Sequence, residues 1–138
     1  MKIAFACDHG GFELKKTVLE HLENRGVEYI DFGCNSTTSV DYPDYGIPAA
    51  KAVAGGECDM GIFICGTGIG GIRAACCSDT FSARMTRMHN DANVLCLGAR
   101  VVGAGLALDM IDLFIDTQYM GGRHDARIAK ITALENEN

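Results

Sequence analysis

Three segments place reactive side chains beside glycines, the pattern expected where a ligand approaches the backbone. They are Cys7-Asp8-His9-Gly10-Gly11, Cys65-Gly66-Thr67-Gly68-Ile69-Gly70 and Gly98-Ala99-Arg100. Each segment follows a short apolar run, and ligands of doubly wound α/β sheets bind beyond the carboxyl ends of the strands. We therefore expect the three segments, together with His89-Asn90-Asp91, to converge on one edge of a sheet.

Cys65 adjoins the glycine segment Gly66–Gly71, which satisfies the pattern G-x-G-x-x-G. Amide dipoles next to a thiol favour the thiolate, and exposed N–H groups suit a phosphate or an enolate oxygen. The alternatives are a tight glycine turn and one more buried Cys. The pattern follows the third apolar run rather than the first, so dinucleotide binding is disfavoured. No Gly-Lys-Ser/Thr follows, so the segment is not a Walker A loop.

The remaining polar candidates each have a structural alternative. Asp8-His9 offers a carboxylate and an imidazole to a ligand, or a helix cap and a surface His. His89 stands at the end of an expected helix, where its charge suits the helix dipole, and it is a catalytic candidate only if it faces Cys65.

A basic segment lies near the end of the chain. Arg123 and Arg127 are four residues apart and suit a phosphate, unless Asp125 pairs with one of them. Arg100 is a third candidate for a phosphate contact.

Apolar runs alternate with helical patterns along the chain. The expected strands are Lys2–Cys7, Val27–Phe32, Met60–Cys65, Ile72–Cys77 and Asn93–Gly98. The expected helices lie between Gly11 and Arg25, near Pro43–Ala54, from Ser78 or Asp79 to about Met88, over Leu106–Ile115 and over Ala126–Leu134. This alternation predicts one α/β domain over residues 1–138, a three-layer Rossmann-like fold with a mostly parallel five-stranded sheet.

Composition limits the classes of function. The 138 residues carry a net charge of −6, which argues against nucleic-acid partners and anionic membranes. No apolar stretch is long enough to span a membrane. The seven Cys are odd in number, include no C-x-x-C and stand mostly in apolar runs, so we expect buried thiols in a reducing cytoplasm. Cys/His spacing typical of zinc sites is also absent, and no metal is expected.

Taken together, the motifs resemble the ribose-5-phosphate isomerase type B family, which includes the galactose-6-phosphate isomerase subunits. The matching blocks are Cys-Asp-His-Gly-Gly (7–11), Asp-Tyr-Pro-Asp-Tyr (41–45), Ala-Gly-Gly-Glu-Cys-Asp (54–59), Ile-Cys-Gly-Thr-Gly-Ile-Gly (64–70), Gly-Ile-Arg-Ala-Ala (71–75), Arg-Met-His-Asn-Asp-Ala-Asn-Val-Leu (87–95), Gly-Ala-Arg-Val-Val-Gly (98–103) and Gly-Gly-Arg-His (121–124). Each block alone is weak, but all of them in this order are highly specific.

The resemblance implies a cofactor-free aldose–ketose isomerase that acts on a phosphosugar through a cis-enediolate. It also implies a homodimer, with tetramers as an open alternative, and active sites formed between subunits. By matching position, Cys65 is the base, Thr67 assists it, and His89 with Asn90 promotes opening of the furanose ring. The amides of Gly66, Gly68 and Gly70 would stabilise the enediolate, and the expected substrate contacts are Asp8, His9, Tyr42, Arg100, Arg123 and Arg127.

The chain departs from the family pattern at one junction. Family members continue the glycine loop with a stretch like Ile-Ser-Ile-Ala-Ala-Asn-Lys, whereas here Gly70 meets Gly71, about nine residues short of that pattern. A parallel crossover needs roughly a dozen residues, so either the flanking strands are antiparallel or a segment is missing from the printed sequence. An intact mass of 14.7 kDa would indicate a true deletion.

Two alternatives to a ribose 5-phosphate isomerase stay open. One is an isomerase of a hexose phosphate such as galactose 6-phosphate or allose 6-phosphate, because pocket depth decides the length of the sugar. The other is a non-catalytic phosphosugar-binding module, which would keep the arginines and the glycine loop without needing Cys65.

Overall fold

The computed structural model describes residues 1–66 and 73–135 of the chain. Within these ranges the strands are β1 Lys2–Cys7, β2 Glu28–Asp31, β3 Met60–Cys65, β4 Ala74–Cys76 and β5 Val94–Gly98. The helices are α1 Phe12–Asn24, α2 Pro43–Ala54, α3 Thr80–Asn90, α4 Ala104–Asp116 and α5 Asp125–Glu135, with a 3-10 turn at Gly122–His124. Each expected strand and helix is therefore present, although β4 and β2 are shorter than their apolar runs.

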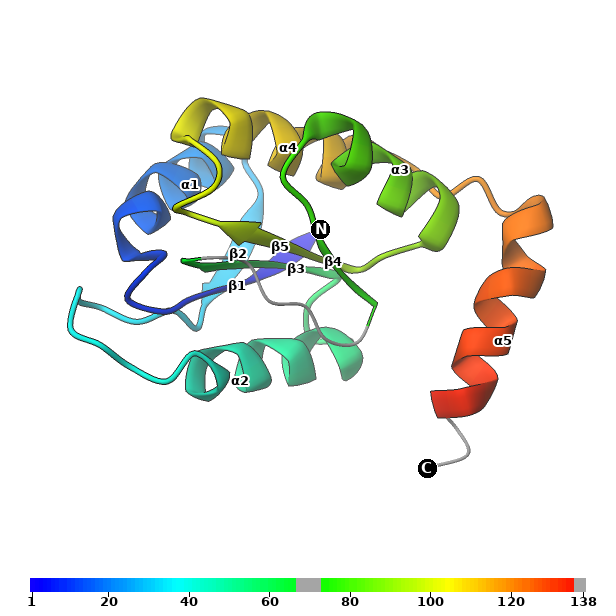
Figure 1. The fold of residues 1–138 in the computed structure, drawn as a ribbon, viewed down its shortest axis with the longest axis horizontal. Coiled ribbons are helices and arrows are strands. Elements are labelled where there is room, and N and C mark those ends of the chain that lie inside the picture. The colour runs from blue at the N-terminus through cyan, green and yellow to red at the C-terminus, as the bar shows by residue number, and fades with distance from the viewer. Residues whose placement is uncertain (67–72, 136–138) are drawn as a thin grey trace.

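The five strands form one sheet in the order β2-β1-β3-β5-β4, and every described pair of neighbours is parallel. Helices α1, α3 and α4 cover one face and α2 covers the other, which gives three layers (Figure 1). The expected three-layer α/β fold is confirmed, and the sheet is parallel throughout the described strands.

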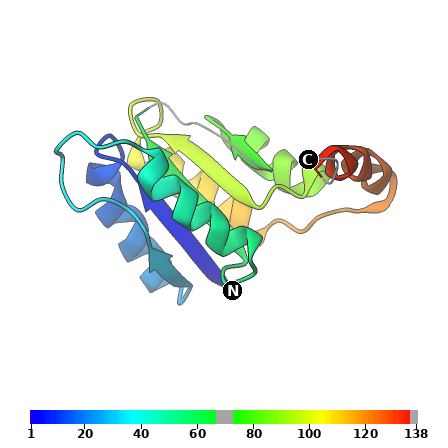
Figure 2. The same ribbon diagram turned by 90° about the horizontal axis from the view of Figure 1, so that it is seen from below.

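The side chains of β1 show how the two faces differ. Ile3 and Phe5 join the larger apolar core under α1, α3 and α4, whereas Ala4 and Ala6 join a smaller core with Ala49 and Val53 of α2. Successive strand residues point to opposite faces, so small residues at alternate positions allow α2 to lie close to the sheet. Figure 2 shows α2 running along that face.

Strand β4 lies beyond β5 and parallel to it, so the antiparallel alternative for the short junction was wrong. Register places Cys65 level with Gly98 and Ala74 level with Val94, four residues back along β5. The chain must therefore return about 13 Å along the strands and cross two strand spacings of about 4.8 Å. Nine residue steps reach about 30 Å at full extension, so the short connection is long enough. Residues 67–72 of this connection lie outside the described ranges.

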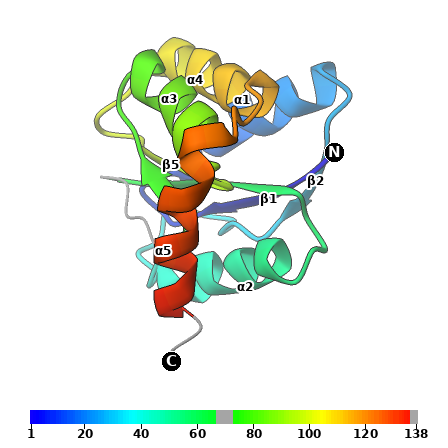
Figure 3. The same ribbon diagram turned by 90° about the vertical axis from the view of Figure 1, so that its right-hand side faces the viewer.

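Helix α5 stands beside the three layers and extends past the level of the sheet toward α2 (Figure 3). Ile131 and Leu134 on this helix are 53% and 62% exposed, and Met120 before it is 59% exposed. An extended helix with exposed apolar side chains offers a surface for another protein chain. Within the described residues, no helix has the length and apolar character needed to cross a membrane.

Candidate active site

Cys65 ends β3 at the carboxyl edge of the sheet, next to the end of β5. Ala99 N donates a 2.7 Å hydrogen bond to Cys65 O, and Arg100 N donates one of 3.1 Å to Gly66 O. These bonds bring the Arg100 side chain over Gly66, where an added Cβ would lie 3.4 Å from the guanidinium carbon. The backbone therefore places a half-buried thiol beside an exposed guanidinium, as the sequence predicted for this edge.

Asp8 directly follows β1 at the same edge and is 9% exposed. Its Oδ1 accepts hydrogen bonds from Gly10 N at 2.8 Å and Gly11 N at 3.2 Å. A Cβ on Gly10 would lie 2.8 Å from Gly66 N, too close for any side chain. Asp8 thus holds the turn before α1, but the helix itself has Gly11 at its N-cap without a side-chain cap, so the expected helix cap is not what the structure shows. Asp8 also lines the cavity beside Cys65.

His9 is oriented by the loop before α2. Val40 N donates a 3.2 Å hydrogen bond to His9 Nδ1, so the neutral ring carries its proton on Nε2. Tyr42 at the start of α2 is 46% exposed and faces the same region. His9 Nε2–H is therefore a donor that a ligand oxygen can use.

Two adjoining cavities open at this edge and share Asp8, Tyr42 and Cys65. The smaller is about 190 Å³ and has polar and apolar surface in similar amounts; its lining residues are Asp8, His9, Gly10, Tyr42, Cys65, Gly66 and Arg100. The larger is about 440 Å³ and lies between α2 and strands β1 and β3, with a mainly apolar lining that includes Pro43, Ile47 and Phe63. We take the smaller cavity as the centre of the candidate site because the reactive groups surround it.

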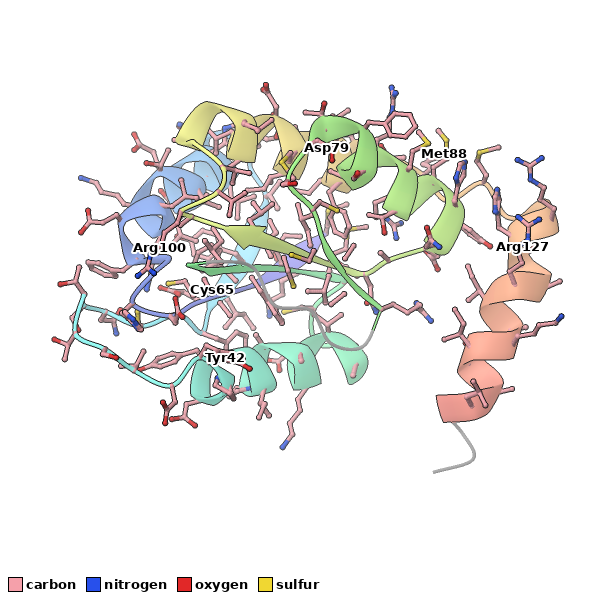
Figure 4. The ribbon with its side chains drawn as sticks, viewed as in Figure 1. Tyr42, Cys65, Asp79, Met88, Arg100 and Arg127 are labelled. Atoms are coloured by element: carbon pink, nitrogen blue, oxygen red, sulfur yellow. The ribbon has the colours of Figure 1, made fainter. Side chains whose placement is uncertain are left out.

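His89 and Asn90 do not join this cluster. They end α3 at the amino end of β5, whereas Cys65 is level with Gly98 at the carboxyl end. Val94 and Gly98 alone are about 13 Å apart along the strand. Figure 4 shows Met88 and Arg127 on the opposite side of the chain from Cys65 and Arg100. The expectation that His89-Asn90-Asp91 converges with the other segments was wrong, because a segment before a parallel strand lies at that strand's amino end.

His89, Asn90, Arg123 and Arg127 instead gather around the end of α3. Arg123 belongs to the 3-10 turn and Arg127 to α5, and both are exposed. Asp125 accepts a 2.7 Å hydrogen bond from Tyr119 Oη, and no ion pair among the described residues involves either arginine. The salt-bridge alternative for these arginines is therefore not what the structure shows.

The turn after His89 is held by a buried arginine. Arg87 Nη1 donates to Asp91 Oδ1 at 2.8 Å and to Ala92 O at 2.6 Å, and its guanidinium carbon lies 5.7 Å from the centroid of the Phe114 ring. Asp91 has a φ of 46°, a left-handed conformation that reverses the chain after α3. Arg87 thus connects the end of α3 to the turn that follows it and to α4.

Sequence reasoning missed one residue of this second cluster. The His124 ring stacks on that of His89, with 4.5 Å between ring centroids. The sequence singled out the neighbouring Arg123 and Arg127 and not this ring, because no spacing in the sequence relates residues 89 and 124.

The seven Cys differ in their surroundings. Cys7, Cys34, Cys58, Cys77 and Cys96 are buried, Cys65 is half-buried and Cys76 is exposed. Burial raises the pKa of Cys7 and of Cys96 to about 12 and that of Cys77 to about 11, so these groups stay protonated thiols at neutral pH. Most Cys are small buried hydrophobes, as expected, but Cys76 is an exception because it lies on the edge strand.

Three expected site residues, Thr67, Gly68 and Gly70, lie outside the described ranges. Among the residues that are described, no group of three or more His, Cys, Asp or Glu is arranged to hold a metal ion.

The fold and the site are those of one class of protein, and comparison with known sequences identifies its family. The chain belongs to the Ribose/Galactose Isomerase family, whose sequence profile matches residues 3–131. It is thus a member of a family of sugar-phosphate isomerases, as its motifs indicated.

Particular relatives are similar over nearly the whole chain. Ribose-5-phosphate isomerase B of Escherichia coli is 52% identical over 143 residues, which cover 97% of this chain and 96% of the relative. The structure of ribose-5-phosphate isomerase B from Clostridium thermocellum is similar with a TM-score of 0.95 and 51% identity, over 99% of both chains. That of ribose-5-phosphate isomerase B from Mycoplasma genitalium with bound ribulose-5-phosphate has a TM-score of 0.92 and 37% identity, over 99% of this chain and 97% of the other.

The comparison also bears on chain length. The alignment with the Escherichia coli protein is five residues longer than the whole chain, although it covers 97% of it. The chain therefore lacks residues that this relative has, which agrees with a junction that is short for a parallel crossover.

Proposed function

We propose that this chain interconverts ribose 5-phosphate and ribulose 5-phosphate through a cis-enediolate, with Cys65 as the base. The observation that carries the proposal is that the half-buried Cys65 lines a small cavity together with the polar residues Asp8, His9 and Arg100. Relatives and structural neighbours named as ribose-5-phosphate isomerase B support this substrate.

The reaction moves hydrogen within one molecule and needs no external oxidant or reductant. In the open-chain aldose, the Cys65 thiolate removes the proton from C2, the C2–H electron pair forms the C1=C2 bond, and the C1 carbonyl becomes O1⁻. Cys65 returns that proton to C1, while the O2 hydroxyl proton moves to O1 and O2 becomes the ketone. Backbone N–H groups at Gly66 and beyond it, at Gly68 and Gly70, would stabilise the developing oxyanion, with Thr67 assisting the base.

The groups around the cavity suit the rest of the substrate. His9 Nε2–H would donate to a sugar or phosphate oxygen, and the Asp8 carboxylate would accept a hydrogen bond from a sugar hydroxyl. Tyr42 lines the cavity, and the exposed Arg100 guanidinium is placed for a phosphate. A bound phosphate would fix the position of C1 and C2 against the thiol, which lowers the barrier of the chemical step.

We further propose that the working unit is a homodimer in which the α3 end of one copy completes the site of the other. His89 and Asn90 would promote ring opening there, and Arg123 and Arg127 would bind the phosphate. The separation of these residues from Cys65 within one chain supports this arrangement, as do the exposed apolar side chains Ile131 and Leu134 of the projecting helix α5. Such a metabolic enzyme belongs in the cytoplasm, without a metal or an organic cofactor.

The proposal is tested by isomerisation of ribose 5-phosphate with a chelator present, using the wild type, Cys65→Ala and Cys76→Ala. Removing a general base lowers the rate by about 10²–10⁴-fold, so we expect this loss in Cys65→Ala. Cys76→Ala is the matched control, because that thiol is exposed on the edge strand, and it should keep the wild-type rate. Ribose 5-phosphate should still raise the thermal midpoint of Cys65→Ala.

Other outcomes separate the alternatives. No turnover of ribose 5-phosphate by a folded dimer, with turnover of galactose 6-phosphate or allose 6-phosphate, would identify a hexose-phosphate isomerase. Binding without turnover of any of these sugars, in the wild type as in Cys65→Ala, would identify a phosphosugar-binding module. Intact mass measured on the same sample tells whether the chain tested has the short junction, for which 14.7 kDa is expected.

A further inference from the structure

His124 is buried by its contact with His89. The two rings are nearly parallel, at 15°, with 4.5 Å between their centroids. The His124 side chain is 6% exposed, and its Nε2 has no hydrogen-bond partner among the described residues. The ring nitrogens of a buried imidazole usually form hydrogen bonds. Because His124 Nε2 has none among the described residues, the contact that His124 makes here is through the face of its ring.

The turn that carries His124 is hydrogen-bonded to the end of α3. Met120 N donates a 3.0 Å hydrogen bond to Met88 O, directly before His89. Gly121 and Gly122 follow with φ values of 63° and 62°, which side chains rarely adopt, and they let the chain turn sharply beneath α3. The 2.7 Å bond from Tyr119 Oη to Asp125 Oδ1 closes the turn on its far side. The stacked contact is therefore built by the backbone on both sides.

Burial and the neighbouring cations favour the neutral form of the His124 ring. Burial lowers its pKa below the usual range, and His89, Arg123 and Arg127 lower it further, while Asp125 acts in the opposite direction. Two stacked imidazoles repel each other only when both are protonated. A neutral His124 can thus remain stacked whether His89 carries one proton or two.

We propose that His124 is a positioning residue for His89: its stacked ring sets the plane of the His89 imidazole, so that the ring nitrogens of His89 present their edge to the sugar. This inference rests on the proposed function, in which His89 opens the furanose ring of the substrate. His124 itself does not touch the substrate, and its nitrogen atoms take no part in proton transfer.

The test compares His124→Phe and His124→Ala with the wild type in ribose 5-phosphate turnover. A Phe ring preserves the stacked face and removes the unpartnered nitrogen, so His124→Phe should keep kcat within about threefold. His124→Ala should lower kcat about tenfold, with KM changed less than twofold, because a loosely held His89 affects ring opening rather than binding. His21→Ala is the matched control, since that imidazole pairs with Asp112 on the α1–α4 surface, and it should leave both constants unchanged.

Different kinetics would overturn the proposal. An equal loss in His124→Phe and His124→Ala would mean that the imidazole nitrogens act chemically. A rise in KM alone would mean that His124 contributes to binding, and no loss in His124→Ala would mean that the stacking has no function.

A second measurement does not depend on activity. Relaxation of the His89 ring carbons, assigned among the four His with a His89→Gln variant, reports the motion of that ring. Ring mobility should rise in His124→Ala and stay at the wild-type level in His124→Phe, and an unchanged ring in His124→Ala would refute positioning. If the mobility of the His89 ring rises in His124→Ala but the wild type has no turnover, the stacking does position His89, and it is the proposed function that is wrong.

Discussion

The distance between Cys65 and His89 within one chain predicts that two inactive variants restore activity to each other. Cys65 is level with Gly98, and His89 precedes β5 at its other end, so at least about 13 Å of strand separates them. If one copy supplies Cys65 and its partner supplies His89, a mixed dimer of Cys65→Ala and His89→Ala chains contains one site with both wild-type residues. The second site of that dimer lacks both.

The expected magnitude follows from symmetry. Random exchange between equal amounts of the two variants makes about half of the dimers mixed, and one of the two sites in each is intact. The mixture should therefore reach about a quarter of the wild-type rate, compared with the small residual rate of either variant alone.

The assay measures ribose 5-phosphate turnover before and after subunit exchange, with native mass spectrometry to count mixed dimers. Two Cys65→Ala samples mixed in the same way are the control and should gain nothing. If mixed dimers form in the expected proportion and the rate stays at the level of the separate variants, both residues act within one chain. That result would refute the shared site.

Two further predictions concern stability. Lys15 Nζ lies 2.7 Å from Asp31 Oδ2 and donates a 2.9 Å hydrogen bond to the buried Cys34 O. Lys15→Met removes the donor to this carbonyl, so it should lower the free energy of unfolding measured in urea by about 1–2 kcal/mol. Equal stability with Lys16→Met, a control at an exposed site, would contradict this. Asp79 Oδ1 accepts a 2.7 Å bond from Ser82 N, a hydrogen bond that lowers the pKa of Asp79. At pH values above the ordinary Asp pKa of 3.8, Asp79→Ala should therefore lower the thermal midpoint. The difference from the wild type should vanish as the pH falls through the lower pKa that Asp79 has in the folded state. A difference that persists in strong acid would contradict the cap.

Much of the fold could be predicted because it is encoded locally. The continuous apolar runs of β1 and β3 and the pattern of α2 gave their bounds without error, and Asp79 was one of two expected caps for α3. Boundaries were less accurate where tertiary contacts end an element: β4 covers only Ala74–Cys76 of its apolar run, the residues that stand in register with Val94–Cys96 of β5. The edge of the sheet at which a reactive residue lies was predictable for Asp8, Cys65 and Arg100, because each stands at or just after the carboxyl end of a strand.

The sequence alone determined which chemical groups this protein carries and on which kind of element each one stands, because periodicity, caps and glycine turns act over a few residues. The tertiary structure decided which groups meet. Strand order placed β5 between β3 and β4, which put Arg100 over Gly66 and left His89 at the far end of β5. The stacking of His124 on His89 joins residues 35 positions apart, through a turn whose docking depends on the packed end of α3. Contacts of this kind arise from packing between distant segments, and no local pattern records them.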